Sequence, residues 1–321
     1  MSELKGLAAT LSQNVASVQK DIVQVQSELS SGKRTLNAAE VGIVTRLSAQ
    51  VSGYETVAAN VKRSLDLLAV TGTALGSTTT ILSQMKDIAT QAANAGLTSA
   101  DRTALNSSFS QLSAQVGSLL KGATVNSTNL LCSTTFMADA SISTGNQVIQ
   151  TGLTSSNSTT LLSANLDTEV DAAVATAITA VVTNFGGAGE AAARTTLATA
   201  VAAAAATGKL NVATLALSLT GDSTANGQAR ASCAMDILTV ALSTVSNKQS
   251  IVGAEQTGLK EQSTAALTLA NNLQSTVDSI QNIDETALQA KLQQLNNQQS
   301  IDYYLISQMN TAAAAVLTIF R

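Results

Sequence analysis

Apolar residues near the N-terminus recur in alternating steps of four and three, and this spacing constrains the fold more than any other feature of the chain. The repeat holds at Leu4, Ala8, Leu11, Val15, Val18, Ile22, Val25 and Leu29. A narrow stripe with this spacing is typical of the contact line of a coiled coil, which needs a partner helix to cover it. The alternative is one amphipathic helix packed on an ordinary core, although its apolar stripe is usually wider.

The same spacing returns in three later stretches of the chain. It runs from Leu47 to Ala89, from Leu105 to Leu119, and from Leu238 to Ile280. Polar side chains fill some expected positions of the last stretch, namely Gln249, Gln256 and Ser263. Beyond a break at 282–284 a second stripe follows, made of Leu288, Leu292, Leu295, Leu305, Met309, Ala312, Val316 and Ile319. These patterns predict that both chain ends are helical and pair with one another.

The repeat is absent from about Thr124 to Arg230, which predicts a separate module in the middle of the chain. Residues 133–165 are rich in Ser, Thr, Asn and Gly, and the pair Gly145-Asn146 predicts the turn of a β-hairpin. Two Ala-rich helices are expected near 167–184 and 188–206, with a strand over 210–219.

The composition argues against an enzyme. The chain of 321 residues has no His, Trp or Pro, and only 12% of its residues are charged. Without His, the chain cannot use Ser-His-Asp or Cys-His catalysis, and it cannot hold a metal through His ligands. Long uninterrupted helices tolerate the absence of Pro, whereas loop-rich domains normally use it in turns. We therefore expect a helical assembly protein without cofactor or metal.

The charge balance predicts no nucleic-acid partner, and the polarity of the apolar stretches predicts no membrane partner. The net charge is −4 and the isoelectric point is near 4.9, whereas nucleic-acid binding needs clustered Lys and Arg. The first ten residues lack the apolar core of a secretory signal. The stretch from Tyr303 to Phe320 is interrupted by Gln308 and Asn310, which makes it too polar for a membrane span.

A terminal helix with an apolar stripe has to bury that stripe against something. Two partners are open at this point: another helix of the same chain, or a neighbouring copy in an assembly, on which the chain ends would become ordered. For the second case the predicted assembly interface consists of Leu4, Leu11, Val15, Val18, Ile22, Val25, Leu29, Leu305, Met309, Val316, Ile319, Phe320 and Arg321.

Six short segments, in the same order along the chain, resemble those of bacterial flagellins. The first, ELSSGKRTLNAA at 28–39, is similar to the family's LSSGxRINSAxDD segment. The others are MKDIATQAAN at 85–94, DRTAL at 101–105, ATVNSTNLL at 123–131, IDETAL at 283–288 and VLTIFR at 316–321. One acidic residue of the family's usual pair is missing after the first segment, where Glu40 alone remains. The acid-poor pattern looks most like flagellins of the alphaproteobacterial kind.

The resemblance implies a mainly α-helical fold in which N- and C-terminal helices pair into a coiled-coil rod, with a smaller, mixed α/β variable domain inserted in the middle. In this division 1–35 and 283–321 are the inner coiled-coil helices. The N-terminal and C-terminal parts of the rod domain are 36–131 and 233–282, and 132–232 is the variable, surface-exposed domain.

The resemblance also implies a function. The chain would be a structural subunit that self-assembles into the extracellular flagellar filament for swimming. Its partners would be copies of itself, hook-associated junction and cap proteins and an export chaperone, with secretion through the flagellar type III apparatus. Two alternatives stay open, a hook–filament junction protein and a secreted adhesion or signalling protein.

Cys132 and Cys233 bracket the middle region. If that region leaves the rod and returns beside its exit point, the two Cα atoms come within the roughly 4.4–6.8 Å that a disulfide needs. The alternative is a pair of buried thiols that pack as small apolar side chains.

Overall fold

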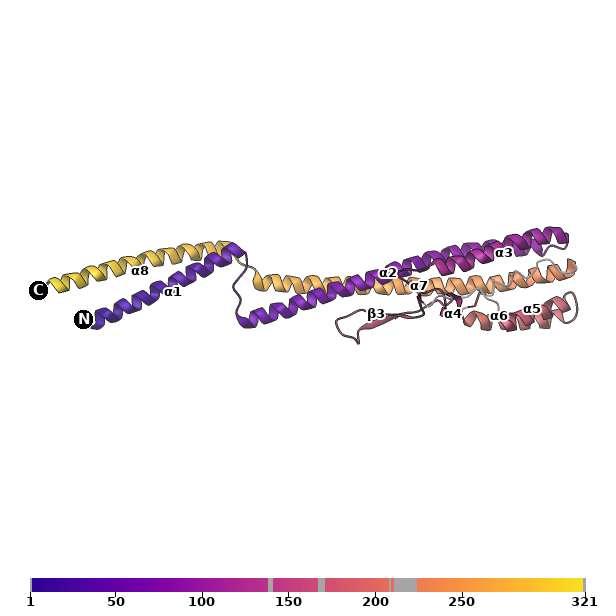
Figure 1. The fold of residues 1–321 in the computed structure, drawn as a ribbon, viewed down its shortest axis with the longest axis horizontal. Helices are drawn as coiled ribbons and strands as arrows, with labels where there is room; N and C mark the ends of the chain where they lie inside the picture. The colour runs from indigo at the N-terminus through magenta and orange to yellow at the C-terminus, as the bar shows by residue number, and fades with distance from the viewer. Residues whose placement is uncertain (1, 138–140, 167–170, 208, 211–223, 320–321) are drawn as a thin grey trace. The chain divides into compact units, whose positions relative to one another are not determined.

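The structure, a computed structural model, describes residues 2–137, 141–166, 171–207, 209–210 and 224–319 (Figure 1). The chain is mainly helical, as predicted. The helices are α1 (Ser2–Ser31), α2 (Ala38–Ala92), α3 (Ser99–Gly122), α4 (Thr134–Met137), α5 (Ala172–Asn184), α6 (Glu190–Ala206), α7 (Thr224–Gln281) and α8 (Glu285–Ile319). The strands are β1 (Thr128–Asn129), β2 (Ser143–Thr144), β3 (Gln147–Gln150) and β4 (Ser158–Leu161).

The chain divides into two compact units. Unit 1 contains Met1–Gly53 and Thr268–Arg321, and unit 2 contains Tyr54–Leu267. The long helices α2 and α7 therefore contribute residues to both units. The five-part division expected from the sequence stays a prediction.

In unit 1 the helices α1 and α8 pack against each other, with the two chain ends at the same end of the pair (Figure 1). Their shared core is small, and it consists of Val18, Ile22, Val25 and Leu295. The three residues from α1 keep the predicted four-three spacing, so this stripe is the line along which α1 contacts α8. The expected pairing of N- and C-terminal helices is confirmed.

Unit 2 is organised around two heptad series that belong to one hydrophobic core. On α2 every seventh residue is fully buried, at Val61, Leu68, Leu75, Leu82 and Ala89. On α7 the corresponding series is at most 4% exposed, at Leu238, Val245, Val252, Leu259 and Ala266. A strict seven-residue repeat on both helices is the packing pattern of a left-handed coiled coil.

The polar positions in the α7 stripe lie beside glycines of α2. A Cβ atom added to Gly72 would lie 3.8 Å from the amide nitrogen of Gln256, and one added to Gly76 would lie 4.0 Å from that of Gln249. The side chains of Gln249 and Gln256 thus lie where α2 has glycine and therefore no side chain of its own. This arrangement explains how α7 tolerates two glutamines close to its heptad line.

The middle region contains the two predicted Ala-rich helices, α5 and α6, which pack against each other. They are separated by Gly186, whose φ of 72° suits glycine. Of the strand expected over 210–219, only the buried Leu210 lies within the described residues.

The predicted turn at Gly145-Asn146 is wrong. The hairpin is formed by β3 and β4, which pair antiparallel with Gln147 opposite Leu161, and its loop is 151–157. Gly145, at a φ of 90°, instead joins β3 to β2, which pairs in parallel with β1 in a different sheet. Asn146 accepts hydrogen bonds from the backbone and hydroxyl of Ser163, so the turn-forming residue types serve a connection between two sheets.

Candidate assembly interface

Part of the predicted interface is covered by the chain itself. Val18, Ile22 and Val25 are 3–7% exposed in the core between α1 and α8. Leu11, Val15 and Leu29 are half-buried. The stripe shifts by one residue at its end, because Glu28 rather than Leu29 takes the buried position, at 7% exposure.

On α8 the predicted stripe divides between two sides of the helix. Leu288, Leu292 and Leu295 pack in the core with α1, and Met309 is half-buried. Leu305 is 45% exposed, and its neighbours Ile301 and Tyr304 are also exposed, at 59% and 63%. We call Ile301, Tyr304 and Leu305 the exposed face of α8. The sequence reasoning missed Ile301 and Tyr304, although their spacing from Leu305, at i, i+3 and i+4, is that of one helical face.

The side chains of Leu4, Val316 and Ile319 lie outside the described part of the chain, as do Phe320 and Arg321.

A carboxylate occupies the α1-facing side of α8. Asp302 follows Leu295 by seven residues and is only 8% exposed. Its Oδ2 atom is buried and has no hydrogen-bond partner among the residues that the structure describes. A buried oxygen atom without a hydrogen-bond partner costs free energy, so we expect Asp302 to weaken the α1–α8 pair at this position.

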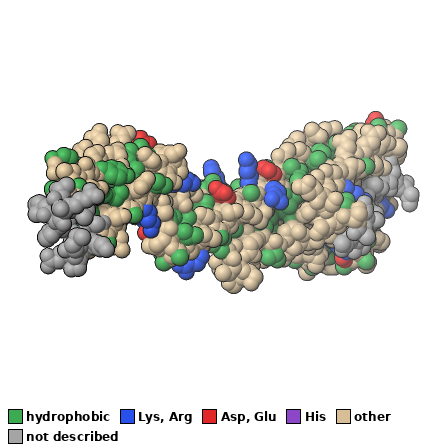
Figure 2. All heavy atoms as spheres, turned by 60° about the vertical axis from the view of Figure 1, so that its left-hand side comes forward, with side chains coloured by type: hydrophobic (Ala, Val, Ile, Leu, Met, Phe, Trp, Pro, Cys, Tyr) green, Lys and Arg blue, Asp and Glu red, His purple; other side chains and the backbone are tan. Residues whose placement is uncertain are grey.

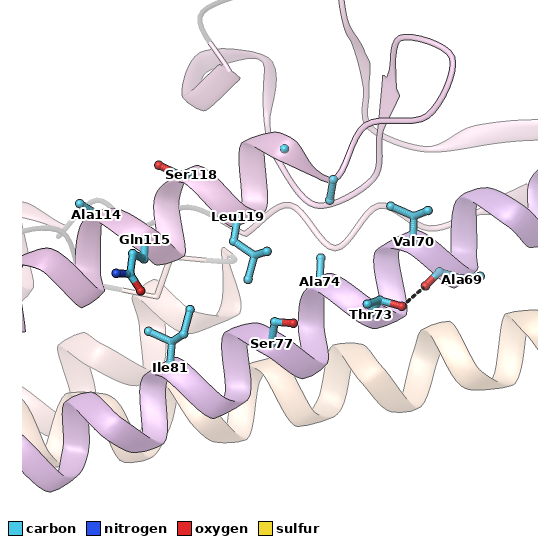
Figure 3. A pocket seen from close by; sticks show the side chains of 12 residues that line it. Ala69, Val70, Thr73, Ala74, Ser77, Ile81, Ala114, Gln115, Ser118 and Leu119 are labelled. Carbon is cyan, nitrogen blue, oxygen red and sulfur yellow. Dashed lines mark hydrogen bonds between the residues drawn. The ribbon is translucent and has the colours of Figure 1, made fainter.

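Helices α2 and α3 frame an open groove in unit 2 with a volume of about 860 Å³ (Figure 3). Most of its lining side chains are small, and none is charged: Ala69, Val70, Thr73, Ala74, Ser77, Ile81, Ala114, Gln115, Ser118, Leu119, Gly122 and Ala123. The Thr73 hydroxyl is already used, because it donates to the backbone oxygen of Ala69 over 2.9 Å. The groove thus offers apolar contact area and no acid, base or nucleophile pair for chemistry.

Two of the flagellin-like segments contribute helix caps. The Arg102 side chain is 1% exposed and donates to the backbone oxygens of Ala92 (3.1 Å), Asn94 (2.6 Å) and Leu97 (2.9 Å). It therefore donates to the last carbonyl of α2 and to two carbonyls of the turn that follows it. Next to it, Asp101 and Thr98 form the reciprocal capping box that begins α3. These hydrogen bonds from Thr98 hold the pKa of Asp101 below its usual value.

Asn129, from the segment at 123–131, performs the same task at the end of α3. Its buried amide donates to the backbone oxygen of Leu120 over 2.9 Å. Its side-chain oxygen accepts from the backbone N–H groups of Leu131 (2.7 Å) and Cys132 (3.0 Å). The two segments therefore shape the turns between helices.

Both cysteines are fully buried, and no disulfide joins them within the described structure. Burial raises the pKa of the Cys233 thiol to about 11. The disulfide between Cys132 and Cys233 stays a prediction, which a count of alkylated thiols can decide.

Among the described residues there is no cluster of three or more His, Cys, Asp or Glu side chains that could hold a metal ion. Acidic and basic side chains are few and interspersed on the face that Figure 2 shows.

Among the residues that the structure describes, one helix is long and apolar enough to cross a membrane, judged by length and composition alone. This helix is α2, whose most apolar window has a mean hydropathy of 1.3. Its residues from Val57 to Ala92 also supply much of the core of unit 2, and 39% of that apolar window is buried.

Comparison with known proteins connects this architecture to one family. Residues 5–135 match the bacterial flagellin N-terminal helical region. The chain is 33% identical over 104 residues to the flagellin of Listeria monocytogenes, a match that covers 31% of this chain and 34% of the relative. The flagellin of Listeria innocua gives the same values. The flagellin FlaB2 of Treponema pallidum is 26% identical over 122 residues, which is 38% of this chain and 43% of that protein. The matches thus span between a third and a half of the relatives' length. The likeness to alphaproteobacterial flagellins stays a prediction.

Proposed function

Because this chain belongs to the flagellin family of structural, non-enzymatic proteins, we propose that it is a filament subunit that polymerises with copies of itself to build a flagellum for swimming. The exposed face of α8 is the observation that supports this proposal most directly. Ile301, Tyr304 and Leu305 are 45–63% exposed, although they lie on a helix whose other side already packs against α1.

The chemistry of this face suits a protein partner. Large apolar side chains grouped on one helical face mark an interaction surface more often than single exposed ones do. Burial of such side chains contributes about 25 cal/mol per Å² of apolar surface removed from water. Tyr304 adds a polar end, and its hydroxyl oxygen accepts a hydrogen bond from Gln308 over 2.8 Å. A second copy of the chain is the occupant that the family implies.

The finer parts of the proposal follow from the same assignment. The filament would be extracellular, its subunits would leave the cell through the flagellar type III apparatus, and an export chaperone with junction and cap proteins would be its other partners. A hook–filament junction role is less favoured, because the family match and the relatives named above are all flagellins.

Polymerisation of the purified chain tests the proposal. Full-length protein is seeded with short filament fragments, and electron microscopy and sedimentation measure filament length and critical concentration. We expect long filaments of uniform width from the natural chain. We expect Leu305→Ser to raise the critical concentration about tenfold or more, because about 1.4 kcal/mol of lost contact energy per subunit suffices for that change.

A matched control separates this effect from general damage. Leu153, in the loop between β3 and β4, is 41% exposed, close to the 45% of Leu305. Leu153→Ser should polymerise like the natural chain, and both variants should keep its circular dichroism. If the natural chain forms no filaments under any seeding condition, the filament function is wrong, and binding to hook ends or to host surfaces becomes the next function to test.

A further inference from the structure

The linker between α1 and α2 is held by polar contacts at both ends. It comprises residues 32–37 and lies in unit 1, as does the break between α7 and α8 at 282–284. The two connections meet, because the backbone N–H of Arg34 donates to the backbone oxygen of Gln281, the last residue of α7, over 2.8 Å. We call these two connections, 32–37 and 282–284, the junction.

Glu28 carries the contacts on the α1 side. Its Oε1 atom accepts a hydrogen bond from the backbone N–H of Thr35 over 3.0 Å and another from the Gln24 amide over 3.2 Å. The residue is 7% exposed, although it ends a stripe of Val18, Ile22 and Val25. A carboxylate at this position would be costly unless its hydrogen bonds compensated for the loss of water.

The charge of Glu28 is stabilised in place. Burial by itself raises the pKa of this carboxyl, but the hydrogen bonds from Gln24 and Thr35, together with Lys291 on α8, outweigh burial and bring the pKa below its usual value. Glu28 therefore stays ionised at neutral pH. It connects its own helix to the linker by a hydrogen bond and to α8 by charge.

Glu40 carries the contacts on the α2 side. It forms an ion pair with Arg34, and it shares a reciprocal capping box with Asn37, at 3.0 Å and 2.9 Å. This is the one carboxylate that remains where the flagellin segment usually has two. The first turn of α2 is thus fixed to the linker through residues that precede it.

We propose that Glu28 is a positioning residue, whose carboxylate holds Thr35 and thereby sets the direction in which α2 leaves the α1–α8 pair. Fixed geometry at this point matters in a polymer, because every copy must present the same orientation of its helices to its neighbours. This consequence rests on the filament function proposed above, whereas the positioning itself is a property of the single chain.

Hydrogen exchange of the monomer tests the positioning without any filament. In Glu28→Ala the Thr35 amide loses its acceptor, so exchange in a peptide covering 30–37 should become about tenfold faster or more. Glu28→Gln retains an acceptor without the charge, and its exchange rate should lie between those of the natural chain and Glu28→Ala. Asp21 is an exposed acidic residue on the same helix, so Asp21→Ala is the matched control and should leave this peptide unchanged. A peptide covering 15–25 reports whether α1 itself has loosened.

The helical pitch of the filament separates a positioning residue from a purely stabilising one, because a loss of stability alone would leave the pitch unchanged. Filaments of Glu28→Ala should form at the critical concentration of the natural chain and differ from it in helical pitch, whereas filaments of Asp21→Ala should keep the natural pitch. Unchanged exchange in the 30–37 peptide of Glu28→Ala overturns the proposal, whatever the filaments look like. If exchange rises but the natural chain forms no filaments, the positioning role stands and the filament function fails.

Discussion

Arg102, in the first turn of α3, donates its Nε–H to the backbone oxygen of Ala92, the last residue of α2, over 3.1 Å. The same guanidinium reaches the carbonyls of Asn94 and Leu97, so one buried side chain binds both ends of the turn between two helices. The planar fork of Arg suits this task, because its several donors are held in fixed directions.

We expect Arg102→Met to lower the free energy of unfolding of the chain by about 3 kcal/mol, since the backbone oxygens of Ala92, Asn94 and Leu97 lose the Arg102 guanidinium as a donor. Urea titration followed by circular dichroism measures the loss. Arg63 is exposed on α2, and Arg63→Met should change stability by about 0.5 kcal/mol at most. Equal stability of the two variants would show that Arg102 is not needed as a cap.

Gly72→Ala should stabilise the chain by about 0.5–1 kcal/mol, because alanine costs less backbone entropy in a helix interior than glycine does. The new methyl group would meet Val252 and Gln256 at 3.8 Å, which is ordinary van der Waals contact. Thermal unfolding measures the gain. A lower melting temperature would mean that α7 approaches α2 more closely at this level than the structure has it.

Asp302→Leu should strengthen the α1–α8 pair by on the order of 1–3 kcal/mol, because it replaces a buried carboxylate, whose Oδ2 atom has no hydrogen-bond partner among the described residues, by an apolar side chain. Slower hydrogen exchange in α1 peptides measures this gain. Asp278→Leu, an exposed aspartate near the end of α7, is the control and should leave α1 unchanged. Faster exchange in α1 of Asp302→Leu would show that the carboxylate has a stabilising partner.

Glu255 predicts a dependence of stability on pH. Burial raises the pKa of this carboxyl, and the hydrogen bond that its Oε1 accepts from the backbone of Leu162 at 2.8 Å only partly offsets that effect. A raised pKa means that the folded chain holds this proton more tightly than the unfolded chain does. The contribution of Glu255 to stability is therefore complete below its unfolded pKa of about 4.5 and is lost as the pH rises through the higher, folded pKa.

Glu255→Gln keeps the acceptor for Leu162 and removes the titration. Its melting temperature should be higher than that of the natural chain at pH 8, and the difference in melting temperature should be smaller at pH 4. Melting curves of both proteins at the two pH values measure this, and a difference that grows toward low pH would contradict it.

The cysteines can be tested by alkylation. With a thiol pKa of about 11, Cys233 should react slowly with iodoacetamide at pH 8 in the folded chain, because the thiolate is the reactive form. After denaturation without reductant, mass spectrometry should find two labelled thiols if the pair is reduced. An unlabelled pair that becomes reactive only after reduction would establish the predicted disulfide between Cys132 and Cys233.

Much of the helical architecture could be predicted from the residues alone. The four-three spacing of Val18, Ile22 and Val25 and the cap at Thr98 are local signals, since each depends on residues less than two turns apart. The hairpin was misplaced for the opposite reason. Gly145-Asn146 permits a tight turn, but the choice of strand partner is made by contacts such as that between Leu162 and Glu255, 93 residues apart.

By itself the sequence determined that this chain forms long paired helices with a distinct middle region, because periodicity and capping act over a few residues. Only the tertiary structure decided which side of each helix is covered. It buries Asp302 and Glu28 in the apolar line of unit 1, leaves Ile301, Tyr304 and Leu305 exposed, and makes Arg102 the cap of a preceding helix. Burial depends on the register of a partner helix far away in sequence, and no local pattern encodes that register.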